Sequence, residues 1–270
     1  MVFARRRGGV LLGCLLLALS AALSGCSRAE PRASPATEDA LIVFAAASLR
    51  DVFTALGREF EREHAGATLT FNFAGTQELR TQLEHGAPAD VFASADQRHM
   101  TELAARGRVV SPAIFARNEL VLVVADFARE TIRTFADLPR AERIVVGAPE
   151  VPIGRYTAQV LERAETKLGL HFRSEVAARI ASRELNVRQV LAKVSLGEAD
   201  AGIVYRSDVH ASQGRVQVVA IPSELNALAD YPIAVVTGAP HPALAAAWLA
   251  LVQSARGQAL LRNAGFLPPN

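Results

Sequence analysis

Cysteine is almost absent from this chain of 270 residues. The only two, Cys14 and Cys26, lie in the first 26 residues, ahead of the globular part. Because the globular part can form no disulfide, its stability has to come from a hydrophobic core. Aromatic residues make up only 6% of the chain, so an aliphatic core is expected. The 13 prolines and 18 glycines are ordinary numbers and exclude a collagenous or low-complexity chain.

An excess of positive charge is also lacking. The formal net charge is +2, but three arginines lie in the first 26 residues, which contain no acid. Without that segment, 26 of the 29 basic residues remain against 27 acidic ones. Nucleic-acid binding needs clustered basic residues, so no nucleic-acid partner is expected.

The first 26 residues have the pattern of an export signal. Arg5, Arg6 and Arg7 precede an uncharged stretch from Val10 to Leu23. A membrane-spanning helix needs about 20 apolar residues, whereas the apolar part of a signal peptide needs about 7–15. The shorter length favours an exported protein whose signal is removed.

The end of this segment, Leu23-Ser24-Gly25-Cys26, resembles the lipobox of bacterial lipoproteins. This resemblance implies that Cys26 is lipidated and becomes the mature N-terminus, on the periplasmic or cell-surface side of a membrane. A plain signal peptide with an incidental cysteine is the alternative. Residues 27–39 are polar, contain two prolines and show no periodicity, which predicts a flexible tether.

From residue 40 onward, short apolar runs alternate with helical patterns, which predicts an α/β fold with mainly parallel sheets. The length suggests two lobes, with residues 40–117 and 231–270 forming lobe 1 and residues 118–230 forming lobe 2. The expected strands are 41–46, 67–74, 89–95, 119–125, 143–148, 201–205 and 231–238. The expected helices are 49–60, 75–86, 96–107, 152–169 and 186–200, followed by one long or two short helices in 241–266.

Four of the predicted strand-to-helix turns are small and neutral. They are Ala45–Leu49, Ala74–Gln77, Pro152–Gly154 and Asn186–Arg188. The first turn of a helix presents unpaired N–H groups and a partial positive charge, so converging helix starts form an anion site without lysine or arginine. Ligands of open α/β sheets also bind at the carboxyl ends of strands. Any one turn is weak evidence, because a residue such as Ser48 or Asn186 is more often a simple N-cap than a ligand contact.

Five segments occur together in one order and spacing: AAASL (45–49), QLEHGAPADVFASAD (82–96), VGAPEVPIGRY (146–156), NVRQVL (186–191) and GIVYRSD (202–208). In this combination they resemble the ModA family, the substrate-binding proteins of molybdate ABC transporters. The resemblance implies a type II-like periplasmic-binding-protein fold, with two α/β lobes and a ligand cleft between them. It also implies a monomer, without enzymatic activity or cofactor, that captures molybdate or tungstate and delivers it to a membrane permease.

The same resemblance implies a site in which backbone N–H groups, two hydroxyls and a tyrosine hold a tetrahedral oxyanion. Matched motif by motif, the contacts fall on Ser48, Thr76, Ile153, Val187 and Tyr205. The second turn departs from the family, which usually has consecutive serines where this chain has Gly75-Thr76-Gln77. Ile153 also stands where an alanine is often found.

The chemistry of these five positions narrows the ligand independently. None is Asp, Glu or His, so a protonated ion such as hydrogen phosphate would find no side-chain acceptor for its proton. Burying an unpaired donor costs about 1–3 kcal/mol, which favours a fully deprotonated dianion such as molybdate, tungstate or sulfate.

Two other classes of protein stay open at this point. An exported enzyme acting on an anionic metabolite would need a positioned acid, base or nucleophile, and the turns contain hydroxyls and backbone donors but no titratable partner. A binding protein for an organic acid would need an arginine clamp, which Arg50, Arg155 or Arg188 could supply. The six histidines show no metal-ligand spacing, and Asp90 and Asp96 are interpreted as turn and cap residues.

Overall fold

The computed structural model describes residues 39–269, which form one compact unit. The predicted export signal, Cys26 and nearly all of the predicted tether lie outside the described residues. Asp39, the last residue assigned to the tether, is instead the first residue of a strand. Among the described helices, none combines the length and apolar character needed to cross a bilayer.

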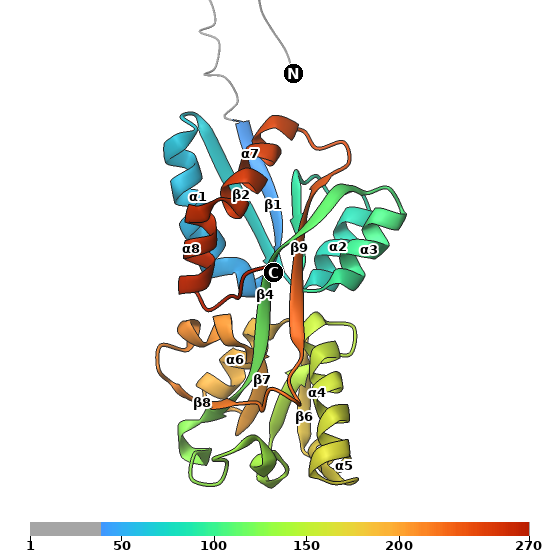
Figure 1. The fold of residues 1–270 in the computed structure, drawn as a ribbon, viewed down its shortest axis with the longest axis vertical. Helices are drawn as coiled ribbons and strands as arrows, with labels where there is room; N and C mark the ends of the chain where they lie inside the picture. Colours follow the sequence, from blue (N-terminus) through green and yellow to red (C-terminus); the bar gives the residue numbers. More distant parts are fainter. Residues whose placement is uncertain (1–38, 270) are drawn as a thin grey trace, which may run out of the picture. The chain divides into compact units, whose positions relative to one another are not determined.

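A single mixed sheet runs through the fold in the order β2-β1-β3-β9-β4-β7-β5-β6, with β8 paired to β4 (Figure 1). The upper part in Figure 1, here called the first lobe, contains β1 (Asp39–Ala46), β2 (Ala67–Ala74) and β3 (Val91–Ala93). The second lobe contains β5 (Ile144–Gly147), β6 (Ile180–Glu184), β7 (Ala201–Tyr205) and β8 (Val216–Ala220).

Helices flank both lobes and confirm the predicted α/β class. Those of the first lobe are α1 (Arg50–Glu63), α2 (Thr76–Glu84), α3 (Gln97–Ala105), α7 (Pro242–Gln253) and α8 (Ala255–Asn263). Those of the second lobe are α4 (Pro152–Leu168), α5 (Phe172–Ala178) and α6 (Val187–Ser195). Strands pair in parallel in the outer parts of both lobes, with β1 beside β2 and β3 and with β5 beside β6 and β7.

Two long antiparallel strands, β4 (Val109–Ala125) and β9 (Leu228–Val236), run from one lobe into the other (Figure 1). In the first lobe β9 pairs with β3, and in the second lobe β4 pairs with β7. The sequence pattern indicated only residues 119–125 of β4. Its first part is interrupted by Pro112 and by register shifts around Ala113 and Ala116, irregularities that allow a proline within a strand.

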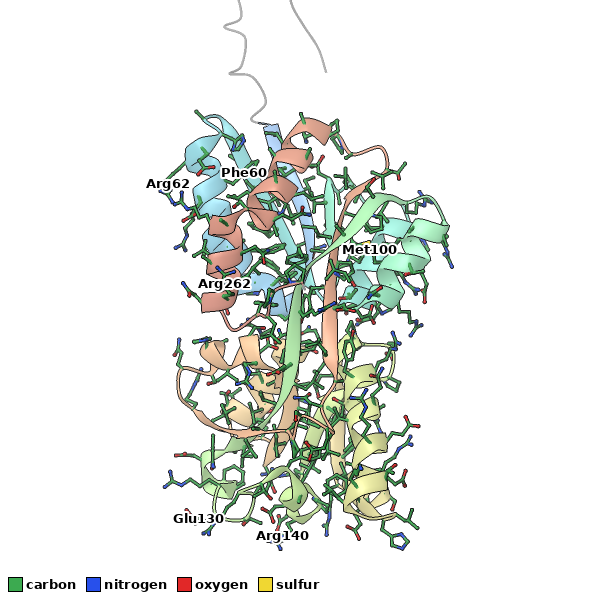
Figure 2. The ribbon with its side chains drawn as sticks, viewed as in Figure 1. Phe60, Arg62, Met100, Glu130, Arg140 and Arg262 are labelled. Atoms are coloured by element: carbon green, nitrogen blue, oxygen red, sulfur yellow. The ribbon has the colours of Figure 1, made fainter. Side chains whose placement is uncertain are left out.

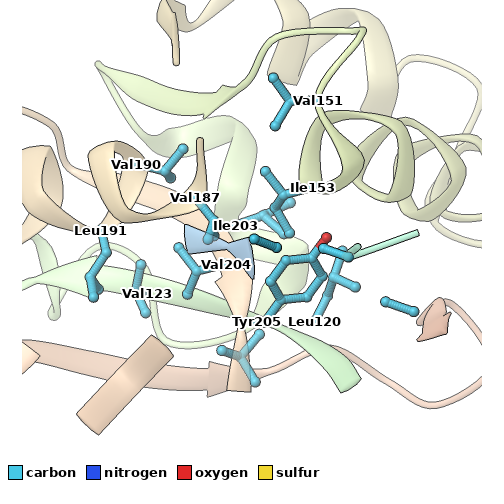
Figure 3. Close-up of a cluster of buried hydrophobic side chains, with 14 of the residues drawn as sticks. Leu120, Val123, Val151, Ile153, Val187, Val190, Leu191, Ile203, Val204 and Tyr205 are labelled. Atoms are coloured by element: carbon cyan, nitrogen blue, oxygen red, sulfur yellow. The ribbon is translucent and has the colours of Figure 1, made fainter. Parts of the chain in front are cut away.

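The two lobes have different cores. In the first lobe the buried Trp248 lies edge-on to Phe53 at 5.3 Å and to Phe60 at 5.7 Å between ring centroids. Phe60 faces this core, whereas Arg62, two residues later on α1, is exposed (Figure 2). The expected aliphatic core is found in the second lobe, where valine, leucine and isoleucine side chains cluster around Tyr205 (Figure 3).

Several elements differ from the sequence-based expectation. The predicted helix 186–200 ends at Ser195. The C-terminal segment forms two short helices, which is one of the two predicted alternatives, and it is divided at Ser254, whose hydroxyl caps α8 by accepting from Gly257 N at 3.1 Å. The strands β6 and β8 and the helix α5 were not predicted. The side chains of β6 alternate between half-buried and exposed, so its sequence, IASRE, lacks an apolar run.

Candidate anion-binding pocket

All five predicted site residues line one pocket between the two lobes. The space between its walls that no protein atom fills is about 220 Å³, including the part open to solvent. No residue in the lining carries a charge. The lining consists of Ala46, Ala47, Ser48, Ala74, Gly75, Thr76, Ala95, Val151, Pro152, Ile153, Asn186, Val187 and Tyr205.

Four helix starts face this pocket, two from each lobe. In the first lobe, a short 3-10 turn (Ala47–Leu49) leads into α1, and α2 begins at Thr76. In the second lobe, α4 begins at Pro152 and α6 at Val187. The first N–H groups of a helix have no partner within the helix, so the four starts supply donors and partial positive charge to an anion.

Two glycines allow the turns to come this close. A Cβ atom on Gly75 would lie 2.3 Å from the carbonyl oxygen of Leu185, a residue of the second lobe. A Cβ on Gly154 would lie 2.0 Å from the carbonyl oxygen of Ala148. Both distances are far below van der Waals contact, so these two positions tolerate no side chain.

Tyr205 presents a buried hydroxyl to the pocket. Its side chain is 1% exposed, and its Oη has no hydrogen-bond partner within residues 39–269. Burial raises the pKa of Tyr205 well above 10, so the phenol keeps its proton and acts as a donor. A buried hydroxyl without a partner costs about 1–3 kcal/mol, and an oxyanion in the pocket would remove that cost. Figure 3 shows Ile153 and Val187 beside this tyrosine.

The other two hydroxyls already have protein partners. Thr76 Oγ1 accepts a hydrogen bond from the backbone N–H of Ala95 at 3.2 Å, which leaves its own hydrogen for a ligand. Ser48 Oγ lies 2.9 Å from the hydroxyl of Tyr231. Sequence reasoning did not identify Tyr231, which lies on β9 and is fully buried.

Polar contacts bridge the two lobes around the pocket, and we call these four contacts the rim. Two of them are ion pairs: Arg155 of α4 pairs with Asp96 at 3.0 Å, and Arg188 of α6 pairs with Asp51 at 2.8 Å.

The other two rim contacts are hydrogen bonds to backbone carbonyl oxygens. Gln77 Nε2 donates to the carbonyl oxygen of Leu185 at 2.7 Å, and His99 Nε2 donates to the carbonyl oxygen of Glu150 at 3.1 Å. Burial lowers the pKa of His99, which favours its neutral form.

Arg188 also anchors a buried carboxylate within the second lobe. Its Nε lies 2.7 Å from Oδ1 of Asp208, whose side chain is fully buried and whose Oδ2 accepts from the backbone N–H of Tyr205. Burial raises the pKa of Asp208 to about 6, and the neighbouring guanidinium opposes this shift. The carboxylate is therefore mostly ionised at neutral pH and holds both Arg188 and the end of β7 in place.

The structure also decides among residues whose role was open. None of the three candidate clamp arginines lines the pocket, because Arg155 and Arg188 belong to the rim and Arg50 lies over the ring of Phe73 at 4.8 Å. Asp90 accepts from the backbone N–H groups of Ile42 and His241, and Asp96 caps α3 through His99 N. The interpretation of both aspartates as turn and cap residues is confirmed.

Comparison with known proteins agrees with this architecture. Residues 41–267 match the family described as "Bacterial extracellular solute-binding protein". The molybdate-binding protein ModA of Mycobacterium tuberculosis is 40% identical over 267 residues, which cover 97% of this chain and 98% of that protein.

Two solved structures resemble this fold equally well. The periplasmic molybdate-binding protein of Azotobacter vinelandii has a TM-score of 0.75 at 20% identity, covering 85% of this chain and 100% of its own. The sulfate-binding protein SubI of Mycobacterium tuberculosis also has a TM-score of 0.75 at 20% identity, covering 85% of this chain and 86% of its own. These likenesses establish the two-lobed binding-protein fold, and the sequence matches show that the chain belongs to the bacterial extracellular solute-binding proteins, in the ModA family.

Proposed function

We propose that this protein captures molybdate or tungstate outside the cytoplasm and delivers it to the permease of an ABC transporter. The observation that carries the proposal is a pocket lined only by neutral groups, into which four helix starts and the buried, unpaired hydroxyl of Tyr205 converge. The 40% identity to a molybdate-binding protein over nearly the whole chain supports the same ligand.

The pocket favours an oxyanion that carries no proton. Its side chains supply hydroxyl donors but no carboxylate or imidazole acceptor. A fully ionised tetrahedral dianion can accept from every donor, whereas hydrogen phosphate would bury a donor without a partner, at about 1–3 kcal/mol. Sulfate meets the same requirement, so sulfate is the second candidate ligand, and pocket size decides between the two.

In this proposal the ligand is held from both lobes. Ser48 and Thr76 donate their hydroxyl hydrogens from the first lobe, and Tyr205 donates from the second. Ile153 and Val187 contribute their backbone N–H groups at the starts of α4 and α6. A ligand that bonds to both lobes favours their closed arrangement, so binding is expected to shift an open–closed equilibrium.

We also propose that the protein is an exported monomer anchored to a membrane through a lipid on Cys26. The support is the lipobox-like sequence at residues 23–26. Replacing Cys26 by alanine should release the protein from the membrane fraction or leave an uncleaved precursor. Fractionation identical to that of the unaltered protein would contradict the anchor.

Equilibrium binding to residues 27–270 tests the proposed ligand. Molybdate, tungstate, sulfate and phosphate are titrated separately by calorimetry, and thermal unfolding is followed at saturation. A ligand at 100 times its dissociation constant should stabilise the fold by about 2.7 kcal/mol. Stabilisation by sulfate alone would identify a sulfate-binding protein, and a melting temperature unchanged by every oxyanion would contradict the proposal.

A further inference from the structure

The side chains of Ser48 and Tyr231 are hydrogen-bonded, and this contact limits where Ser48 can donate its hydrogen. Their two hydroxyl oxygens are 2.9 Å apart, and either group can donate. A serine hydroxyl has one hydrogen. If Ser48 gives that hydrogen to a bound oxyanion, its oxygen has to accept the hydrogen of Tyr231.

Tyr231 is held in place by close packing. It is fully buried, with the rings of Phe266 and Tyr205 edge-on to it at centroid distances of 5.3 Å and 5.7 Å. Burial raises the pKa of Tyr231 well above its ordinary value, while hydrogen bonding with the side chains of Ser48 and Asn118 acts in the opposite direction. The phenol therefore keeps its proton and can donate it in a hydrogen bond.

We propose that Tyr231 is a specificity-determining residue, because its hydroxyl donates to Ser48 Oγ and thereby commits the Ser48 proton to the oxyanion. Tyr231 does not line the pocket and acts only through Ser48. When one lone pair of Ser48 Oγ accepts from Tyr231, the hydroxyl hydrogen of Ser48 is the group directed at the ligand. The inference rests on the proposed function and adds to it Tyr231, the group that orients the Ser48 hydroxyl as a donor to the ligand.

Removing the Tyr231 hydroxyl has two consequences. Ser48 loses the neighbour that orients and polarises its hydroxyl, so binding of every oxyanion becomes weaker. At the same time, its hydroxyl becomes free to turn, so that its oxygen can accept from hydrogen phosphate. The loss should therefore be smaller for phosphate than for sulfate, which has no proton to offer.

The experiment measures molybdate affinity by calorimetry in the processed, exported protein and in the variants Tyr231→Phe, Ser48→Ala and their combination. Tyr231→Phe should weaken molybdate binding by about 2- to 12-fold, the change in affinity that corresponds to losing one hydrogen bond between neutral groups. The double variant should bind no more weakly than Ser48→Ala alone, because Tyr231 acts through Ser48. The matched control combines Tyr231→Phe with Thr76→Val. Thr76 is bonded to Ala95 N and not to Tyr231, so these two losses should add.

Phosphate and sulfate are then compared as competitors of molybdate at a pH at which both are dianions. In Tyr231→Phe the affinity for phosphate relative to sulfate should rise by about 2- to 12-fold, whereas the ratio of molybdate to sulfate should stay constant. A purely structural tyrosine would lower all affinities together. If Tyr231→Phe does not fold, Tyr231→Met replaces it as a variant without a donor.

The outcomes separate this inference from the proposed function. Failure of the unaltered protein to bind molybdate would overturn the proposed function. Normal molybdate binding with additive effects of Tyr231→Phe and Ser48→Ala would overturn the relay through Ser48. An unchanged ratio of phosphate to sulfate in Tyr231→Phe would overturn the role in specificity.

Discussion

The pocket and its rim lie next to each other and use opposite chemistry. The pocket lining has no charged side chain, although its expected ligand is a dianion. The rim, a few residues further along the same helices, contains the pairs Arg155–Asp96 and Arg188–Asp51. Charge is thus placed where the two lobes meet and kept away from where the ligand is recognised.

This separation has a physical reason. An arginine in the pocket would attract every anion, and burying it would carry a large desolvation cost whenever the ligand is absent. Oriented N–H and O–H groups instead distinguish anions by the number of protons that each anion carries and by its geometry. In the pair Arg188–Asp51 the Asp51 side chain is 56% accessible, which lowers the desolvation cost of joining the lobes, whereas Asp96 in the other pair is buried.

The largest loss of molybdate affinity is expected when a negative charge is placed inside the pocket. Two unit charges 4 Å apart interact by about 4 kcal/mol at an effective dielectric constant of 20, and a dianion doubles the repulsion. Ser48→Asp should therefore weaken molybdate binding by more than about 1,000-fold. Ser48→Asn, similar in shape but neutral, is the control. Equal losses in the two variants, measured by calorimetry, would show that charge is not the cause.

The next largest effect is expected for Tyr205→Phe. A hydrogen bond to a charged acceptor contributes about 1.5–3 kcal/mol, so affinity should fall about 10- to 150-fold while the fold is retained. Tyr156→Phe is the control, because Tyr156 lies edge-on to Tyr205 at 6.4 Å but does not line the pocket. Unchanged affinity in folded Tyr205→Phe would remove this residue from the site.

A smaller effect is expected at the rim. Asp96→Asn preserves the cap of α3, since asparagine also accepts at an N-cap, but removes the charge that faces Arg155. Molybdate affinity should fall by about 2- to 10-fold, mainly through faster release, and the effect should shrink at high salt. Glu102→Gln on the same helix is the control, because its partners Arg80 and Arg98 both belong to the first lobe. If the two variants release molybdate at the same rate in stopped-flow experiments, the Arg155–Asp96 pair does not slow release by holding the lobes together.

Val187→Ala should change molybdate affinity least, by less than about 2-fold. The substitution keeps the backbone N–H that is expected to bind the ligand and removes only methyl groups from a side chain that is 4% exposed. The melting temperature should fall, because deleting buried methyl groups leaves a cavity. Calorimetry on the folded variant checks this, and a loss as large as that of Tyr205→Phe would mean that the valine side chain itself shapes the pocket.

The sequence predicted the helix starts of the pocket well, because a turn and the helix that follows it are local in the chain. The strands before two of these starts, β2 and β6, are half-buried or exposed, and β6 itself was not predicted. The strand 67–74 has its predicted bounds, and Ser48, Thr76, Ile153, Val187 and Tyr205 lie together as expected. Whether these five residues bind the ligand stays a prediction, as do the residue numbers chosen as lobe boundaries.

What was missed depends on pairing between distant segments. Tyr231 meets Ser48 only because β9 lies between β3 and β4, a register that periodicity does not encode. The rim pairs join residues 59 and 137 positions apart, so Arg155 and Arg188 were recognised as near the turns but not as partners of Asp96 and Asp51. The edge strands β6 and β8 were missed because their side chains are largely half-buried or exposed.

The position of β9 also sets the order in which the protein can be completed. This strand is the only connection in the sheet between β3 and β4 among the described residues, and α7 and α8 follow it. A nascent chain that ends before residue 228 holds two separate sheet fragments, one of which also lacks Trp248. The chain therefore cannot complete its native sheet until its C-terminal segment has been synthesised.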